Sequence, residues 1–139
     1  MRFVDTNVLL YAVSKAPGEA AKTTKALDLL NEPDLALSVQ VLQEFYVQAT
    51  RATRADRLSH QQASALVEAF IRFTVQDLTL GVVRAALVTR ERFGLSYWDS
   101  AIIEAARALG CTEVLSEDLS ADQDYDGVRV VNPFAQPSG

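Results

Sequence analysis

Four acidic residues that lie far apart in the sequence each occupy a position from which an α/β protein can do chemistry. They are Asp5, Glu44, Asp99 and Asp118. Asp5 and Asp118 each follow a short apolar run, while Glu44 and Asp99 lie in the first turns of helix-like segments. Because the carboxyl ends of parallel strands and the starts of the following helices share one edge of a sheet, we expect the four carboxylates to converge.

Carboxylates that converge without a fixed cationic partner need a metal ion. Like charges a few Å apart cannot all stay ionised, so a divalent cation would have to neutralise them. Carboxylate oxygens are hard ligands that favour Mg²⁺ or Mn²⁺. The residue types therefore predict a metal centre in which the four acids are both the ligands and the catalytic groups. The sequence leaves open whether one or two ions bind.

Each acid, taken alone, also has an ordinary structural interpretation. Asp5 could cap the helix that follows it, and Glu44 could be a solvated helix residue. Asp99 fits the third helical position of a capping box opened by Ser96. Asp118 could form an Asx turn after a strand. One shared metal site accounts for all four positions together, and a helix start that caps itself is also a rigid base for a ligand.

Other catalytic constellations are weak or missing in the sequence. There is no GxxxxGK[ST] phosphate loop and no GxGxxG motif. His60, the only histidine, is expected to be exposed in the first turn of a helix, so a histidine-based triad has little to work with. The single Cys111 is expected to be a buried structural thiol. Trp98 is expected to pack in the core, the alternative being that it stacks on a base together with Tyr97.

The charge balance limits how the chain could bind nucleic acid. A net charge of -5 and a pI of about 4.8 argue against binding through a broad basic surface. They do not exclude a metal-dependent nuclease, because the site acids contribute to the negative count and a bound metal reverses the local sign. Arg51, Arg54 and Arg57 form a local basic cluster. This cluster is either the solvated end of a helix or a set of phosphate contacts for RNA.

Length and composition predict one ordinary domain. The 139 residues, 49% of them hydrophobic, are enough for a sizeable core, so we expect a domain over 1–135 and a loose tail over 136–139. No apolar run approaches the roughly 18 residues that span a bilayer. The N-terminus lacks the apolar stretch of a signal peptide. We therefore predict a soluble, cytoplasmic protein that does not contact a membrane.

Short apolar strands alternate with amphipathic helices along the chain. Ser38 is a plausible N-cap, Ser59 with Gln62 forms a capping box, and Gly94 and Gly110 suit helix C-termini. The pattern predicts a mostly parallel sheet of about five strands with helices on both faces. The expected strands are 2–5, 35–37, 73–75, 113–116 and 128–131, and the expected helices are 7–13, 19–30, 38–49, 59–72, 79–92 and 96–109.

The acids stand within motifs that, in this order, resemble those of PIN-domain ribonucleases. The motifs are Asp5-Thr6-Asn7-Val8-Leu9-Leu10-Tyr11, Val41-Leu42-Gln43-Glu44-Phe45-Tyr46, Tyr97-Trp98-Asp99-Ser100-Ala101-Ile102-Ile103 and Leu115-Ser116-Glu117-Asp118. The size and the ending Asn132-Pro133-Phe134 are similar to those of VapC toxins from prokaryotic toxin–antitoxin pairs. The resemblance covers essentially the whole chain, and the ordered set of acids makes it specific.

The resemblance implies an α/β/α sandwich that works as a Mg²⁺- or Mn²⁺-dependent endoribonuclease. Metal-activated water would cleave the RNA phosphodiester, and a small antitoxin protein would inhibit the chain. The four acids match the acidic quartet of the family, and Thr6, Asn7 and Ser116 match its small polar positions near the metal. Asp122 and Asp124 lie where some members carry a further acid, but the spacing here is irregular.

The expected partners follow from the helices. Apolar stripes at 19–30, 41–49 and 62–73 hold more large side chains than one face of a sheet is expected to cover. A groove between such helices could take the amphipathic helix of a partner. We therefore expect a homodimer of this chain, neutralised by an antitoxin that could also reach the acids with one Arg or Lys.

Two alternatives remain at this stage. The first is a PIN-domain nuclease outside toxin systems, acting in RNA maturation or decay. The second is a non-enzymatic binding module on the same fold, which the loss of one acid would favour, and none is lost. A two-component receiver domain also places acids at strand ends. It needs a lysine near its last strand, and no lysine follows Lys25.

Overall fold

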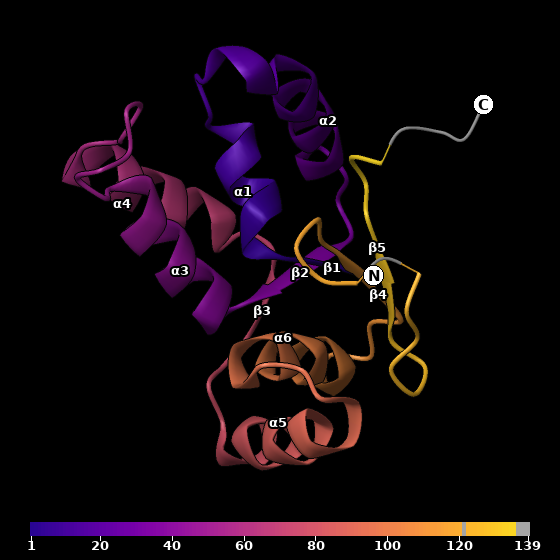
Figure 1. Cartoon of the computed structure of the whole chain (residues 1–139). Coiled ribbons are helices and arrows are strands. Elements are labelled where there is room, and N and C mark those ends of the chain that lie inside the picture. Colours follow the sequence, from indigo (N-terminus) through magenta and orange to yellow (C-terminus); the bar gives the residue numbers. More distant parts are fainter. Residues whose placement is uncertain (121, 136–139) are drawn as a thin grey trace.

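A computed structural model describes residues 1–120 and 122–135 of the chain (Figure 1). The tail expected over 136–139 lies outside the described residues. The elements are β1 (Arg2–Val4), α1 (Thr6–Ala12), the 3₁₀ turn η1 (Pro17–Glu19), α2 (Ala20–Leu30), β2 (Leu35–Ser38), α3 (Val39–Ala49), α4 (His60–Phe70), β3 (Thr74–Gln76), α5 (Leu80–Phe93), α6 (Tyr97–Ala108), β4 (Glu113–Leu115) and β5 (Arg129–Val131).

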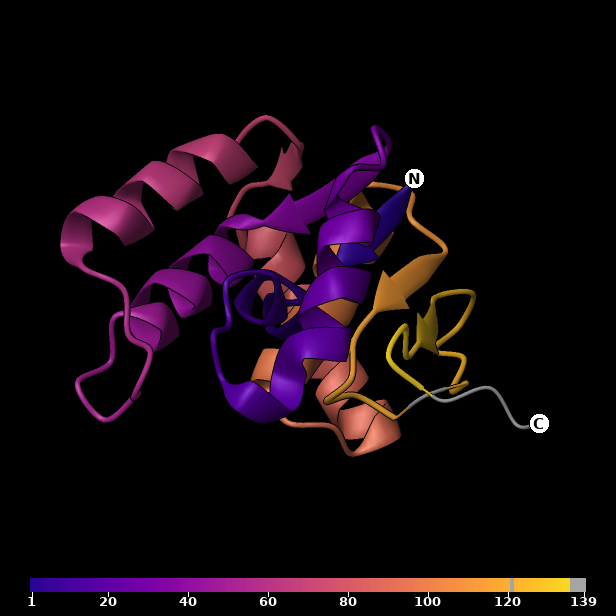
Figure 2. The same ribbon diagram turned by 90° about the horizontal axis from the view of Figure 1, so that it is seen from above.

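The five strands form one sheet in the order β3-β2-β1-β4-β5, and each neighbouring pair is parallel. Phe3 of β1 sits in register with Ala36 of β2 on one side and with Val114 of β4 on the other. Helices α1 to α4 lie on one face of the sheet, and α5 and α6 lie on the other (Figures 1 and 2). The predicted α/β/α sandwich with a parallel sheet is therefore confirmed.

The order of the strands reverses in the middle of the sheet, between β1 and β4. The chain lays down β1, β2 and β3 in one direction and then returns to the far side of β1 to form β4. The helices change face at the same step, because α5 and α6 connect β3 to β4. Such a reversal opens a crevice outside the carboxyl ends of the two strands. Asp5 directly follows β1 and Ser116 directly follows β4, so both lie at this crevice.

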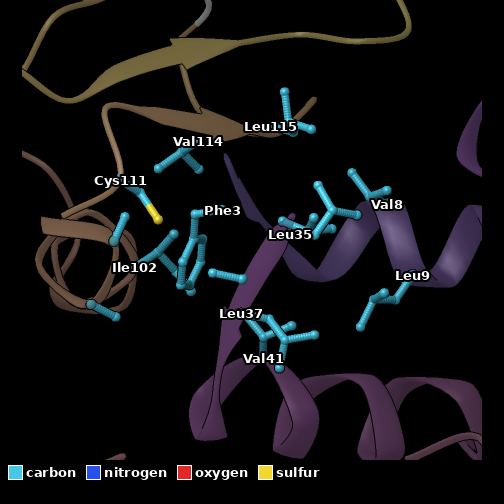
Figure 3. Packing of buried hydrophobic residues seen from close by; sticks show 14 of the residues in the cluster. Phe3, Val8, Leu9, Leu35, Leu37, Val41, Ile102, Cys111, Val114 and Leu115 are labelled. Carbon is cyan, nitrogen blue, oxygen red and sulfur yellow. The ribbon is translucent and has the colours of Figure 1, made fainter. Parts of the chain in front are cut away.

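The core fills both faces of the central strands, whose apolar runs suit strands that are covered on both sides. On the α6 side, Phe3 lies with Ile102 and Cys111 (Figure 3). On the other side, Leu37 lies with Val41 at the start of α3. The thiol of Cys111 is buried and free, as the sequence predicts. Burial of this kind holds the ends of β1 and β4 rigid, and these ends carry the functional side chains.

Most of the predicted helix signals are present, with two corrections. The capping box of Ser59 and Gln62 forms, and Gly94 closes α5 with a φ of 72°. At the start of α6 only the serine half of the expected box is present: Ser96 accepts the N–H of Asp99, while the carboxylate of Asp99 lines a cavity. The helix expected from residue 19 is preceded by the 3₁₀ turn Pro17–Glu19, because Pro17 suits the first position of a helical turn.

None of the helices in the described part of the chain combines the length and apolar character that crossing a bilayer requires.

Candidate active site

The four predicted acids lie together at the crevice between β1 and β4. Asp5, Glu44, Asp99 and Asp118 all line one small cavity of about 80 Å³. They come from four places in the fold: the end of β1, the second turn of α3, the first turn of α6 and the loop after β4. The shared sheet edge thus brings together residues that the sequence separates by up to the whole length of the domain.

Asp5 is the most buried of the four, with only 6% of its surface exposed. Its Oδ1 accepts the backbone N–H of Thr6 at 2.7 Å, and its Oδ2 accepts the hydroxyl of Ser116 at 2.8 Å. Burial raises the pKa of its carboxyl from 3.8 to about 6, the hydrogen bonds of Ser116 and Thr6 oppose this rise, and the charges of Glu44 and Asp118 add to it. A cation beside Asp5 would remove this penalty.

Glu44 is held in place by two donors. The hydroxyl of Thr6 donates to its Oε2 at 2.7 Å, and the side-chain amide of Gln40 donates to its Oε1 at 2.8 Å. Gln40 also donates to the backbone carbonyl of Trp98 at 3.2 Å, which ties α3 to the start of α6. The sequence analysis missed Gln40, although its place one helical turn before Glu44 could have identified it.

Asn7 and Ser116 organise the loop that carries Asp118. The amide of Asn7 donates to Ser116 Oγ at 3.1 Å and to Asp118 Oδ2 at 3.2 Å. Ser116 Oγ also accepts the backbone N–H of Asp118 at 3.2 Å. Thr6, Asn7 and Ser116 are all buried, so water competes little for these bonds. The small polar residues singled out in the sequence therefore contact the acids directly.

Asp99 faces the same cavity from the opposite face of the sheet, at the start of α6. The pKa of its carboxyl is raised above the ordinary 3.8, first by burial and then by the charges of Asp118 and Glu44. Burial is thus the main cause of the raised pKa of both Asp99 and Asp5, and the negative charges of the neighbouring carboxylates add to it. The lining of this cavity, within the described residues, contains neither lysine nor arginine.

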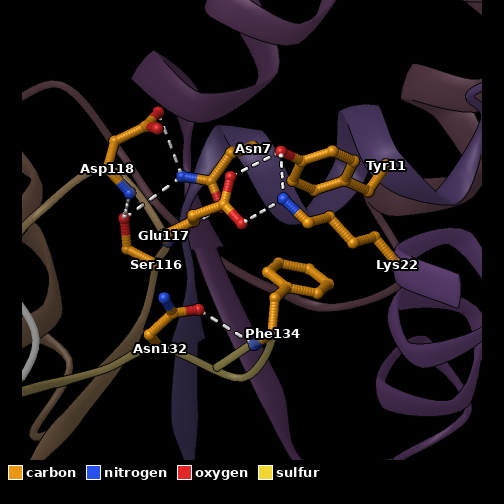
Figure 4. Close-up of polar contacts among 8 residues, drawn as sticks. All are labelled: Asn7, Tyr11, Lys22, Ser116, Glu117, Asp118, Asn132 and Phe134. Carbon is orange, nitrogen blue, oxygen red and sulfur yellow. Dashed lines mark hydrogen bonds and ion pairs between the residues drawn. The ribbon is translucent and has the colours of Figure 1, made fainter. Parts of the chain in front are cut away.

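A second polar cluster, which the sequence analysis did not anticipate, anchors the same loop from outside (Figure 4). Glu117 pairs with Lys22 at 2.7 Å and accepts the hydroxyl of Tyr11, while its backbone N–H donates to Asn7 at 3.1 Å. Burial raises the pKa of Glu117, but the hydrogen bonds of Lys22 and Tyr11 outweigh it and lower the pKa overall. The ring of Phe134 packs edge-on against Tyr11. No local pattern could have revealed contacts across such sequence distances.

The three arginines of the basic cluster have different environments. Arg54 is half-buried and pairs with Asp56 at 2.9 Å, so its charge is partly neutralised. Arg57 is exposed. Arg51 is exposed and lines a groove next to the acids. Arg54 also lines a groove, one that contains Asp118, so Arg51 and Arg54 each lie beside one of the four acids.

Other predicted residues fall outside the cavity. Asp122 and Asp124 lie in the loop between β4 and β5, and neither lines the cavity of the four acids. His60 is exposed at the start of α4, as expected. Trp98 corrects the sequence analysis, which placed it in the core: 63% of its surface is exposed. Trp98 lies on the same side of α6 as the buried Ile102 one turn later, but it is the second residue of the helix and lines an open groove with α3, so its indole stays exposed.

The four carboxylates have the chemistry that a hard divalent cation prefers, but in this structure they are not arranged as a metal site. Four carboxylates with raised pKa values at Asp5 and Asp99 offer only oxygen donors. In the part of the chain that the structure describes, no group of three or more His, Cys, Asp or Glu side chains is placed to hold an ion as it stands.

The raised pKa of Asp5 leads us to expect that, in the absence of metal, the folded chain is more stable at lower pH. Because its pKa is about 6 in the folded chain against 3.8 ordinarily, its stabilising contribution is complete below pH 3.8 and is lost as the pH rises through 6. In excess EDTA, lowering the pH from about 7.5 to about 5 should therefore raise the free energy of unfolding by about 1 kcal/mol from this group. Thermal unfolding at several pH values measures this change.

The variant Asp5→Asn is the matched control for this measurement, since it cannot titrate. Its unfolding midpoint should change less over the same pH interval. Equal changes in the variant and in the original chain would show that the carboxyl of Asp5 is not the titrating group.

Comparison with known proteins identifies the fold. The sequence model of the PIN domain matches residues 2–124. A toxin–antitoxin complex from Klebsiella pneumoniae superposes with a TM-score of 0.70 at 20% identity, covering 96% of this chain and 98% of that one. DNA-bound VapBC from Salmonella typhimurium gives a TM-score of 0.66 at 21% identity, with 93% and 95% of the two chains covered.

A third solved structure comes from a toxin with a named RNA target. VapC20 from Mycobacterium tuberculosis, which cleaves the sarcin–ricin loop, gives a TM-score of 0.63 at 19% identity, covering 85% of this chain and 90% of that one. No curated protein sequence matches the chain significantly. At these levels of identity the structural likeness concerns the fold.

Proposed function

This chain belongs to the PIN-domain family, and from that membership we propose that it is a metal-dependent endoribonuclease acting as the toxin of a toxin–antitoxin pair. The observation that carries the proposal is the cavity that Asp5, Glu44, Asp99 and Asp118 line together. PIN domains are generally nucleases, which supports the nuclease class. Metal dependence and the choice of RNA rest on the chemistry of the cavity.

Asp5, Glu44, Asp99 and Asp118 would hold the ion, Mg²⁺ or Mn²⁺. When bound, it would supply Lewis acidity that activates water near neutral pH and offsets the charge developing on the phosphodiester. The chain offers no buried histidine or lysine beside the cavity that could do this instead, within its described residues. The direct test is cleavage of single-stranded RNA by the purified chain with Mg²⁺ or Mn²⁺, and its absence in excess EDTA.

The surrounding residues position the acids. Ser116 donates to Asp5, Thr6 donates to Glu44, and the Asn7 amide donates to Asp118. Each of these hydrogen bonds fixes the orientation of one carboxylate. The cluster of Glu117, Lys22 and Tyr11 fixes the backbone on which Asp118 stands. Both oxygens of Asp5 and of Glu44 accept one hydrogen bond each, and because a carboxylate oxygen has two lone pairs, each could still face an ion.

The toxin assignment is supported by the neighbours and by a second groove. Toxin–antitoxin complexes are among the similar structures. Between α3 and α4 lies a groove of about 470 Å³ lined mainly by apolar side chains, among them Leu42, Tyr46 and Val67. A groove between two helices suits the apolar face of a partner's helix, here a small antitoxin. We place the pair in the cytoplasm, where RNA is accessible.

The homodimer is a further part of the proposal. Leu80, Leu87 and Val88 of α5 expose between 55% and 72% of their surfaces. Apolar side chains gathered on one element favour association with another chain. A second copy meeting this helix through the same residues would give a symmetric dimer.

Expression of the chain alone should arrest bacterial growth, because uninhibited cleavage of RNA stops translation. Co-expression with the small reading frame next to its gene should restore growth and yield a complex that co-purifies. Colony counts after induction measure the first effect, and affinity purification measures the second. The variant Asp99→Asn is the control and should be harmless on its own. A harmless wild-type chain that nevertheless cuts RNA when purified would favour the alternative of a nuclease of RNA maturation or decay.

A further inference from the structure

Another groove, separate from the one between α3 and α4, opens directly beside the cavity of the acids. It has a volume of about 720 Å³, which is within the range of small-ligand sites. Gln43, Val47 and Arg51 line it from α3 and the residues just after it, and Trp98 lines it from the start of α6. We call it the Trp98 groove. The function proposed above uses none of these four side chains, so their gathering at this place needs its own explanation.

The Trp98 groove and the acid cavity share a wall. Glu44 and Gln48 line both, and Trp98 precedes Asp99 in the chain. The helical period explains this arrangement. Gln40, Glu44 and Gln48 follow one another at intervals of four residues, so they lie along one face of α3. A polymer whose phosphate lies at the acids could therefore place its neighbouring unit in the groove without leaving the surface.

The chemistry of the lining suits a nucleotide. Trp98 offers an exposed indole, with 63% of its surface accessible, backed edge-on by the ring of Tyr97 at a centroid distance of 5.1 Å. Base stacking on such a ring is tolerant of sequence. Within residues 1–120 and 122–135, the exposed side chains of Gln43 and Arg51 form no hydrogen bond or ion pair with the rest of the protein. An amide that both donates and accepts, and a free guanidinium, suit a base edge and a phosphate.

The backbone of Trp98 is tied to the acid site although its ring is exposed. Gln40, which is 6% exposed, donates to the backbone carbonyl of Trp98 and to Glu44. One buried side chain thus links the residue that carries the indole to a site carboxylate, which keeps the groove next to the acid cavity.

We propose that the Trp98 groove is a subsite for one unpaired nucleotide next to the scissile phosphate of an RNA strand, with its base on Trp98 and a phosphate near Arg51. This inference rests on the proposed nuclease function and adds the part of the substrate that the protein grips. A base can enter the groove only if it is not paired, so the subsite selects single strands or loops over duplex RNA.

Trp98 is the only tryptophan of the chain, so its fluorescence reports on the groove directly. The probe is a short unstructured RNA, added to the full chain in excess EDTA so that no cleavage occurs. Saturable quenching of the emission is expected, and much weaker quenching with the same RNA as a duplex. Unchanged emission while fluorescence anisotropy of labelled RNA reports binding would overturn the proposal. An emission shift that depends on protein concentration without RNA would also overturn it, by showing that a second copy covers the indole.

Variants separate stacking from charge. Trp98→Ala should raise the Kd for the single strand at least roughly fivefold, the lower end of base–aromatic stacking, and Trp98→Phe should recover part of the loss. Arg51→Ala should lower the slope of log K against log salt by roughly 0.7. Leu78→Ala, exposed in the loop before α5, and Arg129→Ala, exposed on β5, line neither the groove nor the acid cavity; they are the matched controls and should change neither quantity. Equal Kd values for Trp98→Ala and the original chain would overturn the subsite.

A separate cleavage assay with Mg²⁺ keeps the two proposals apart. Cleavage without quenching would remove the subsite and leave the nuclease. Quenching without cleavage under any divalent metal would remove the nuclease and leave a site for single-stranded RNA.

Discussion

Replacing Asp5 or Asp99 with asparagine is expected to abolish RNA cleavage while the fold stays intact. The amide keeps the shape of the side chain but loses the charge that attracts a divalent ion. Loss of residues that only support a metal ligand typically costs about 10- to 100-fold, so loss of a ligand itself should lower the cleavage rate by at least about 100-fold. Initial rates on a labelled RNA at saturating Mg²⁺ or Mn²⁺ measure the effect.

The fold of these variants should be preserved, because Asp5→Asn keeps one of the two buried hydrogen bonds and removes a charge that burial disfavours. The amide oxygen can accept either the N–H of Thr6 or the hydroxyl of Ser116. Asp122→Asn is the matched control: it makes the same chemical change on an exposed loop and should leave the rate unchanged. Full activity in Asp5→Asn or Asp99→Asn would contradict the carboxylate-metal mechanism. A large loss in Asp122→Asn would extend the site to that loop.

Divalent metal is expected to raise the thermal stability of the chain substantially. An ion that binds only the folded state stabilises it by about 2.7 kcal/mol at a hundredfold excess over its Kd. For a domain of this size that corresponds to a rise in Tm of roughly 5–10 °C. Melting curves in EDTA, followed by Mn²⁺ or Mg²⁺ in excess, measure the shift.

Two controls test whether the rise in Tm comes from metal bound at the four acids. Matching the ionic strength with a monovalent salt separates site binding from general screening. The variant Asp5→Asn should show a much smaller shift, since it removes the most buried of the proposed ligands. A negligible shift of the original chain at millimolar metal, or the same shift in both proteins, would count against a metal site at the four acids.

The sequence was sufficient to predict the fold and the gathering of the acids, for physical reasons that particular residues illustrate. Asp5 and Asp118 follow short apolar runs that are typical of buried strands, and parallel strands align their carboxyl ends. Glu44 and Asp99 stand at helix starts marked by Ser38 and Ser96, which act as N-caps. These are local signals whose spatial consequence follows from the architecture alone.

The sequence did not predict the exposure of Trp98 or the contacts between side chains of distant segments. Trp98 was expected in the core because it is large and apolar, but the start of α6 leaves it outward. Glu117, Lys22 and Tyr11 meet only because α1, α2 and the loop after β4 are adjacent. Periodicity assigns helices and strands, but contacts between distant segments are fixed by packing.

The hydrogen bond between Asp5 and Ser116 joins residues that are 111 positions apart. Its consequence concerns the order of events during synthesis. The first acid leaves the ribosome early, but β1 cannot receive β4 as its neighbour until most of the polypeptide has been made. A nascent or prematurely terminated chain therefore has no assembled cavity. Under the proposed function, in which the chain cuts RNA, this order of assembly would spare the messenger and the ribosome that are producing it until the last strands have been translated.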